Sequence, residues 1–265
     1  MPYLAGIVLY PIKALDPIRV SQARIVGSGA LEHDRELAIV DAEGRLVNGK
    51  RNLLIHNLCT GVNWDEGVVY LDTRQGDRAA QFHLDRERDA LEAWLSDYFS
   101  QPVTLRRNAE GGFPDDPKNP GPTIIGRSSI EQVASWYDGV TYDETKKRFR
   151  ANLEIGDAEP FWEDRLFGPV DENMTFSIGD VQFEGTNPCQ RCIVPTRDTK
   201  TGASTDQFAE IFRARREESL PEWATRERFN HFYRLSVNTR LAPTELGKML
   251  RVGDEVRLSV GTPEE

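Results

Sequence analysis

Two of the three cysteines of the chain lie in one short segment, NPCQRCIVPTRDTKTG, residues 187–202. A Cys-x-x-Cys pair can ligate a metal, exchange a disulfide or pack as two small apolar side chains. A structural zinc site needs four ligands, and no other cysteine or histidine has a matching spacing. A redox pair usually opens a helix that lowers the thiol pKa, whereas β-branched residues and Pro195 follow Cys192 here. The pair itself leaves all three alternatives open.

The neighbours of the pair favour an anionic thiol. Arg191 precedes Cys192, and Arg197 and Asp198 follow within the same segment. A guanidinium beside a thiol stabilises the thiolate, which is the form that binds a soft metal. One cysteine can hold a metal when other ligands complete the site, and a sulfur-bearing organic cofactor would supply them.

Composition limits the class of partner. The 265 residues contain 33 basic and 43 acidic side chains, a formal net charge of −10. This balance argues against nucleic acid and against membrane surfaces as partners, because both are anionic. The opening MPYLAGIVLYPIKAL is interrupted by Pro11 and Lys13 and reads as a first strand rather than a signal peptide. With only three cysteines and no apolar run of about 20 residues, we expect a cytoplasmic protein.

Short strand patterns dominate the chain. They are rich in β-branched and aromatic residues and bounded by Gly, Asp or Asn. Without regular helices between them, such strands predict a mainly β (α+β) fold with antiparallel sheets closed or stacked on themselves. The predicted strands are 4–10, 36–41, 67–72, 103–107, 123–126, 152–156, 174–186, 232–239 and 254–260.

Three amphipathic helices are predicted as cover for the sheets, at 85–99, from Ser128 and at 205–218. Ser128 and Glu131 have the spacing of a capping box. The Pro/Gly/Asp-rich segment 108–122 is a long loop, and such loops are often linkers or active-site loops. We therefore divide the chain into two domains, residues 1–107 and 108–265.

Three blocks of sequence together resemble one known family. NPCQRC…P…D…TG is similar to the signature of the MOSC domain, the β-barrel module named after the C-terminal domain of molybdenum-cofactor sulfurases. Residues 10–44 resemble the β-barrel domain that precedes MOSC, and RFRANLEI, residues 148–155, resembles a block inside MOSC. The blocks occur in the order of the family and span the chain from Tyr10 to about residue 260.

The resemblance implies a MOSC β-barrel preceded by a smaller N-terminal β-barrel-like domain. It also implies the molybdenum cofactor, Mo-molybdopterin, as the bound group. By architecture, the nearest groups are the mitochondrial amidoxime-reducing components and their bacterial counterparts, which reduce N-hydroxylated compounds. The expected function is therefore a molybdenum-dependent oxidoreductase that reduces N-oxygenated small molecules.

The resemblance also implies roles for individual residues. In that group the second cysteine of the motif ligates molybdenum, which points to Cys192 as the metal ligand and catalytic residue. Lys13 and Arg35 match positions that hold the cofactor phosphate, a role suited to a point charge and a planar fork. The remaining expected cofactor-binding residues are Arg150, Asn152, Gln190, Arg191 and Asp198. We expect Lys146, Lys147 and Arg148 to be solvated surface charges.

Several positions depart from the family pattern. Asn119 aligns with a stretch that carries an aspartate beside the metal, so a carboxylic proton donor is missing there. Asp115, with Asp116 beside it, is the tentative replacement if loop 108–122 folds inward. Other departures are Ala14 for a serine, Ala151 for a proline and Phe232 for a tyrosine.

Two further functions stay open. The first is a non-catalytic carrier of the cofactor or of sulfur, and the second is a disulfide oxidoreductase using Cys189 and Cys192. The chain ends soon after its last predicted strand and has no four spare cysteines for an iron–sulfur cluster. An oxidoreductase would therefore need a separate electron-donor protein of ferredoxin, flavin or cytochrome type.

Overall fold

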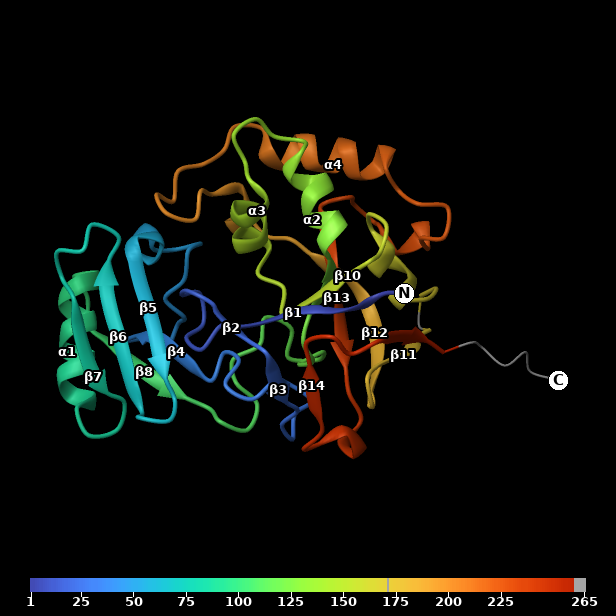
Figure 1. The fold of residues 1–265 in the computed structure, drawn as a ribbon. Coiled ribbons are helices and arrows are strands. Elements are labelled where there is room, and N and C mark those ends of the chain that lie inside the picture. Colours follow the sequence, from blue (N-terminus) through green and yellow to red (C-terminus); the bar gives the residue numbers. More distant parts are fainter. Residues whose placement is uncertain (171, 260–265) are drawn as a thin grey trace.

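The computed structural model describes residues 1–170 and 172–259, and these form two β-rich units side by side (Figure 1). The predicted strand 254–260 therefore extends one residue beyond the described range. The strands are β1 (Tyr3–Leu9), β2 (Ile18–Val20), β3 (Gln22–Arg24), β4 (Leu37–Asp41), β5 (Leu58–Asn63), β6 (Val68–Thr73), β7 (Ala80–His83), β8 (Val103–Arg107), β9 (Ile124–Gly126), β10 (Leu153–Gly156), β11 (Met174–Ile178), β12 (Val181–Gln190), β13 (Arg234–Arg240), β14 (Met249–Arg251) and β15 (Val256–Leu258). The helices are α1 (Arg88–Phe99), α2 (Arg127–Ala134), α3 (Tyr142–Phe149) and α4 (Phe208–Glu218).

The larger unit is a sheet that closes on itself. Its strands follow the order β15-β11-β12-β13-β9-β10-β1-β2. Tyr3 at the start of β1 bridges Glu255 beside β15, and the Val256 amide donates to the Pro2 carbonyl at 2.9 Å. These bonds join the start of β1, the last strand but one in this order, to β15 at the other end, so the sheet closes into a barrel. The mainly β fold predicted from the strand patterns is confirmed.

One strand pair differs from the predicted antiparallel arrangement. β9 and β10 run parallel, with Leu153 opposite Ile124. A parallel pair needs a crossover connection, and α2 and α3 supply it between the two strands. α3 was missed because YDETKKRF has little apolar character.

The N-terminal unit is smaller. β4 pairs with β8, while β5, β6 and β7 form a three-stranded sheet. Leu91 and Leu95 of α1 pack against Val69, Leu71 and Leu105 in its core. These apolar residues lie on the face that the period of the 85–99 segment predicts.

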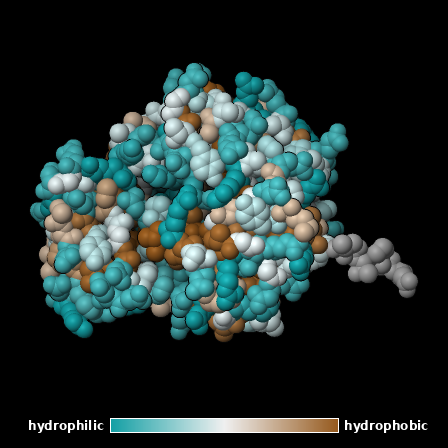
Figure 2. Space-filling model, viewed as in Figure 1, coloured by the Kyte–Doolittle hydropathy of each residue, from teal (hydrophilic) through white to brown (hydrophobic). Residues whose placement is uncertain are grey.

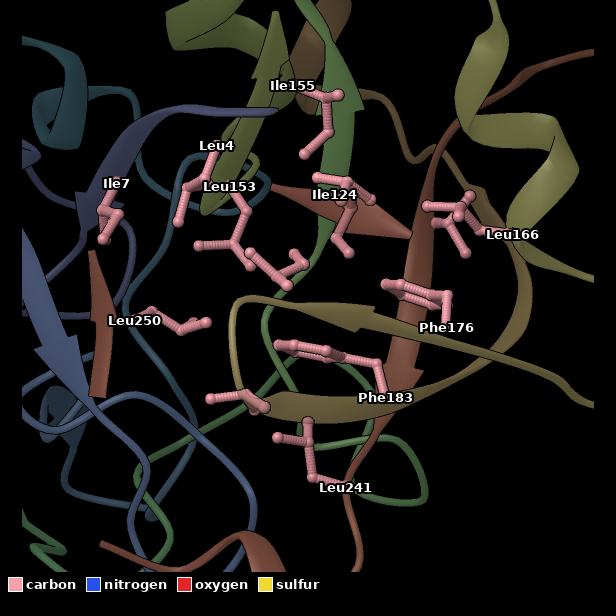
Figure 3. Packing of buried hydrophobic residues seen from close by; sticks show 14 of the residues in the cluster. Leu4, Ile7, Ile124, Leu153, Ile155, Leu166, Phe176, Phe183, Leu241 and Leu250 are labelled. Carbon is pink, nitrogen blue, oxygen red and sulfur yellow. The ribbon is translucent and has the colours of Figure 1, made fainter. Parts of the chain in front are cut away.

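The core of the larger unit contains residues from both ends of the chain. Leu4 and Ile7 of β1 lie with Phe176, Phe183 and Leu250 in one buried cluster (Figure 3). β1 and β2 therefore belong to the barrel in space, although they precede the N-terminal unit in sequence. A boundary drawn at Arg107 along the chain does not separate the two cores.

The helices α2, α3 and α4 lie over one side of the barrel (Figure 1). Their apolar faces share a cluster that includes Ile130, Phe149 and Phe212. The predicted capping box at Ser128 is wrong, because α2 begins at Arg127 and the Ser128 hydroxyl donates to the Ala158 carbonyl. The pattern instead caps α3, where Thr141 accepts from the Glu144 amide at 3.2 Å.

The visible surface is largely hydrophilic, with hydrophobic residues gathered where the two units meet (Figure 2). Among residues 1–170 and 172–259, no helix combines the length and the apolar character that a membrane crossing requires.

Candidate functional site

A cavity of about 600 Å³ lies between the two units. Segments 13–17, 48–50 and 55–56 line it from the N-terminal side, and segments 147–150 and 187–197 line it from the barrel. Pockets of this size accept a drug-sized molecule or cofactor, and a boundary between units is a common place for them.

The two cysteines of the motif have different environments. Cys189 lies within β12, is 5% exposed, and donates from Sγ to Asn238 Oδ1 at 2.8 Å. Burial raises the pKa of the Cys189 thiol, so it stays protonated. Cys192 follows the end of β12 and is exposed at the cavity wall. Cys192 is therefore the thiol available to a ligand, and Cys189 is part of the frame.

No α-helix begins at the pair. A short 3-10 helix, Val194–Thr196, follows the cysteine pair and has Pro195 in its first turn. Within the described residues, no three His, Cys, Asp or Glu side chains gather in a way that could hold a metal ion. A metal at Cys192 would need ligands from a bound organic group.

Arg191 precedes Cys192 in the chain, and its side chain is held in the cavity wall. Its guanidinium donates to the Phe149 carbonyl and, at 3.3 Å, to the Ser236 hydroxyl. It also lies 5.2 Å from the centre of the Phe149 ring, a cation–π distance. Its neighbour Gln190 is exposed at the cavity wall.

A second group of cations lies near Tyr10, and we call Lys13, Arg35 and Arg150 the Tyr10 cluster because the two arginines lie over the Tyr10 ring and act on Lys13. The guanidiniums of Arg35 and Arg150 lie 5.1 and 4.0 Å from the Tyr10 ring centre. Arg150 also donates to the Leu15 carbonyl at 2.8 Å. Both arginines have a φ of 52°, the left-handed conformation, which Arg150 adopts at the C-terminal cap of α3.

Burial affects the charges of the Tyr10 cluster. It raises the pKa of Tyr10 to about 12, so the phenol stays neutral. Burial also disfavours the charge on Arg35, but Asp34 and Asp115 outweigh it and raise the Arg35 pKa. Arg35 therefore stays a cation in a defined position, as an anion site requires.

Asp115 occupies this anion site. Its carboxylate lies 2.7 Å from Lys13 Nζ and 3.9 Å from Arg35 Nε. Lys13 also donates to the carbonyls of Phe113 and Pro114, at 2.8 and 3.1 Å. Burial opposes the charge of Asp115, but Arg35 and Lys13 outweigh it and hold its pKa well below the usual value. A carboxylate held ionised in this way is a poor proton donor at neutral pH.

Two predicted cofactor-binding residues do not line the cavity. Asn152 is buried beneath it, donating to the Val8 carbonyl at 3.0 Å and accepting from Arg35 at 3.3 Å. Asp198 accepts from the amides of Lys200 and Thr201, at 3.0 and 2.8 Å, and shapes its own turn. Both residues hold segments of the wall in place through hydrogen bonds but do not themselves line the cavity.

Two of the three predicted surface charges need correction. Arg148 is buried, donating to Glu144 at 2.8 Å and to Thr205 at 2.9 Å. Lys146 forms an ion pair with the buried Glu154. Only Lys147 is exposed, and it lines the cavity. A dense charge run predicted solvent exposure, but α3 packs two of its three cations inward.

The structure also shows where the positions that depart from the family pattern lie relative to the cavity. Asn119 donates to Asp116 at 2.7 Å and does not line the cavity, whereas Asp115 and Asp116 do. Ala14 lines the wall, Ala151 is buried, and Phe232 stacks on Phe229 in the barrel core.

Sequence reasoning missed part of the wall. Lys50, His56 and Arg74 reach the cavity from the N-terminal unit, and Arg197, Arg234 and Asn238 reach it from the barrel. Arg197 lies in the cysteine segment, which could have indicated it. The residues from the N-terminal unit carry no local pattern, because contact between the units places them there.

The wall is basic in an acidic protein. Its charged residues are ten cations against three carboxylates, an excess of seven, whereas the chain has a net charge of −10. The cations are Lys13, Arg35, Lys50, Arg74, Lys147, Arg148, Arg150, Arg191, Arg197 and Arg234, and the carboxylates are Asp16, Asp115 and Asp116. Such a concentration favours an anionic ligand.

A closed barrel, an appended β unit and a basic cavity holding one exposed thiol define the class of protein. Residues 123–257, just over half of the chain, match the MOSC domain, and residues 1–85 match the MOSC N-terminal beta barrel domain. The chain belongs to the MOSC family.

Among curated proteins, the chain is similar to a molybdenum cofactor sulfurase of Drosophila grimshawi. It is 25% identical over 244 residues, covering 80% of this chain and 30% of that protein. The molybdenum cofactor sulfurase of Danio rerio is 25% identical over 253 residues, covering 77% and 29%. The chain thus spans about 30% of the length of these relatives. Among solved structures, the YUAD protein from Bacillus subtilis aligns over 97% of this chain and 96% of its own, with 8% identity and a TM-score of 0.39.

Proposed function

We propose that the cavity binds the molybdenum cofactor and that the chain is an oxidoreductase that reduces N-oxygenated small molecules. The observation that carries this proposal is the exposed Cys192 thiol in the wall of a strongly basic cavity. Membership of the MOSC family and similarity to proteins named molybdenum cofactor sulfurase support the choice of cofactor.

The residues present fit this group. Cys192 is a soft ligand open to the cavity, and Lys13 and Arg35 already hold a carboxylate where a phosphate could be held. Several buried nitrogens of the wall lack a hydrogen-bond partner, namely Arg191 Nε, Arg197 Nε and Arg234 Nε. Unpaired buried donors are costly, and a ligand with many acceptors would satisfy them.

The bound cofactor would supply a redox metal able to exchange two electrons with the substrate. The protein would supply Cys192 as a ligand and Arg191, fixed on Phe149, as a neighbouring cation in the cavity wall. Lys13, Arg35 and Arg150 would hold the phosphate and orient the group. Asp115 would leave Lys13 when the phosphate arrives.

Electrons would come from a separate protein of ferredoxin, flavin or cytochrome type. The three cysteines of the given sequence are too few for a four-cysteine iron–sulfur cluster.

A second function, a non-catalytic carrier of the cofactor or of sulfur, is favoured by one observation. Asp115 is held ionised by Arg35 and Lys13, while Asn119 turns away to Asp116. Asp115, the expected replacement for the missing proton donor, is therefore poorly suited to protonate a substrate.

One experiment separates the two functions. The protein is purified from a host that makes the cofactor, its molybdenum and pterin are measured, and reduction of a hydroxylamine and an amidoxime is assayed with an artificial electron donor. Bound molybdenum with turnover supports the oxidoreductase. Bound molybdenum with no turnover of several N-oxygenated compounds would reject it and leave the carrier.

A further inference from the structure

The wall of the cavity holds more positive charge than the proposed cofactor can balance. A phosphate monoester brings about two negative charges and the Cys192 thiolate one more. The wall exceeds neutrality by seven, and Asp34 and Glu144, just outside it, pair with Arg35 and Arg148 and lower this excess to five. About two positive charges remain, which indicates a second anionic group in the cavity.

Arg74 and Arg197 lie near His56, and two further cations, Lys50 and Lys147, line the same cavity; all four are distinct from those at Tyr10. We call Lys50, Arg74, Lys147 and Arg197 the His56 cluster. Arg74 donates from Nε to the His56 carbonyl at 2.6 Å, and Arg197 donates to the Gly202 carbonyl at 3.1 Å. A methyl group on Gly202 would lie 3.0 Å from His56 Cδ2, so the two segments meet closely.

The other two cations belong to the same cluster. Lys50 follows Gly49, where a methyl group would lie 2.9 Å from His56 Nε2. Arg74 Nη1 lies 3.3 Å from the Cys59 thiol, whose pKa is raised by burial while Arg74 and Lys147 oppose the rise. Lys147 thus approaches the cluster from α3.

Most of this charge has no counter-ion. Arg74 pairs with Asp16 at 3.0 Å, but Lys50, Lys147 and Arg197 form no ion pair among the described residues. Burial and Arg197 lower the pKa of His56, so the imidazole stays neutral at neutral pH. The nearby Asp198 is engaged by the amides of its own turn.

The cluster is also assembled from both units. Lys50 and Arg74 come from the N-terminal unit, and Lys147 and Arg197 come from the barrel. The segment Leu15–Asp16 lies between the two clusters, because Leu15 accepts from Arg150 and Asp16 accepts from Arg74. A ligand at the His56 cluster would therefore share the cavity with a group held at Tyr10.

We propose that the His56 cluster binds a carboxylate or phosphate group of the substrate, so that the preferred substrates are N-oxygenated acids rather than neutral compounds. This inference rests on the proposed function. Lys50 and Lys147 are specificity-determining residues in this account, since both are exposed and neither holds another residue in place.

The test uses benzamidoxime and 4-carboxybenzamidoxime, a pair that differs only by a carboxylate. Their binding to the cofactor-containing protein is measured by calorimetry without an electron donor, so no turnover is needed. We expect the carboxylated compound to bind about tenfold more tightly, because two exposed charge contacts each contribute a few-fold. We expect the preference to weaken at high salt.

The variant Lys50→Gln/Lys147→Gln removes the two contacts and should lose the preference. The control is Lys118→Gln/Lys200→Gln, which changes the same charge at two exposed lysines outside the cavity wall. The control should keep the preference. The ratio of the two kcat/KM values should change in parallel with the ratio of the two dissociation constants.

Equal binding of the two compounds, or an equal loss in the control, would overturn the inference. A second result would also overturn it: the released cofactor carries a nucleotide, and the amount of bound nucleotide falls in Lys50→Gln/Lys147→Gln. The second anion would then belong to the cofactor and not to the substrate. Absence of turnover would instead reject the proposed function and leave the binding result valid.

Discussion

At the scale of single residues, burial separates side chains that the sequence presents as equivalent. Cys189 and Cys192 form one motif, yet the first is buried against Asn238 and the second faces the cavity. The end of β12 at Gln190 explains the difference, because the backbone leaves the sheet between the two cysteines. Family resemblance predicted which cysteine would be the ligand, whereas spacing alone could not.

Glu163 is a second residue whose chemistry depends on burial. It is fully buried, accepts from Ser129 Oγ at 2.7 Å, and lies next to the ion-paired Asp164. Burial, with a contribution from Asp164, raises the pKa of Glu163 from 4.5 to about 7. The folded protein therefore keeps a proton that the unfolded chain releases between these values, and the associated stability is lost as the pH rises.

We expect Glu163→Gln to be more stable relative to the wild type at pH 8 than at pH 5, by roughly 2 kcal/mol. The amide cannot ionise and keeps an acceptor for Ser129. Denaturant unfolding of both proteins at the two pH values measures the difference. Glu131→Gln, at an exposed position of α2, should show no such pH dependence. The same stability difference from the wild type at both pH values for Glu163→Gln would contradict a raised pKa of Glu163.

At the scale of elements, strands with their own apolar pattern were predictable and strands formed by pairing were not. The patterns placed β1, β4, β6 and β8 within one or two residues. β3 and β14 have three residues each and exist because Leu250 pairs with Ala23 across most of the chain. The predicted strand 174–186 proved to be the β11–β12 hairpin, turning at Gly179.

β12 carries Cys189, the first cysteine of the motif, and packs tightly on the segment before β11. A methyl group at Gly185 would overlap the Leu166 carbonyl oxygen, and backbone atoms cannot yield as a flexible side chain can. We expect Gly185→Ala to lower the free energy of unfolding by about 3 kcal/mol or more. Gly27→Ala, where nothing lies within 4 Å, is the control. A thermal shift of Gly185→Ala no larger than that of the control would contradict the packing.

The loop 108–122 is held at the Tyr10 cluster by Lys13. In cofactor-free protein, we expect Asp115→Asn to bind inorganic phosphate a few-fold more tightly, because a competing carboxylate is removed from two cations. Calorimetric titration measures the affinity. Glu110→Gln, an exposed change of equal charge in the same loop, should have no effect. Weaker phosphate binding by Asp115→Asn would show that Asp115 supports the anion site instead of occupying it.

At the scale of the whole molecule, the functional cavity exists because two units meet. Lys13, Arg150 and Cys192 are distant in sequence, and closure of the barrel with the N-terminal unit beside it brings them to one wall. The resemblance predicted these three. It did not predict the His56 cluster, which depends on how the units contact each other. The net charge of −10 likewise gave no sign of a basic interior surface.

The central claim is that one cysteine of the motif, Cys192, holds the cofactor metal. The most direct test is the molybdenum content of Cys192→Ala and Cys189→Ala, each purified from a host that makes the cofactor. We predict that Cys192→Ala loses nearly all bound molybdenum. Cys189→Ala should retain it and lose about 1 kcal/mol of stability with its buried contact to Asn238. Full molybdenum content in Cys192→Ala would contradict the account.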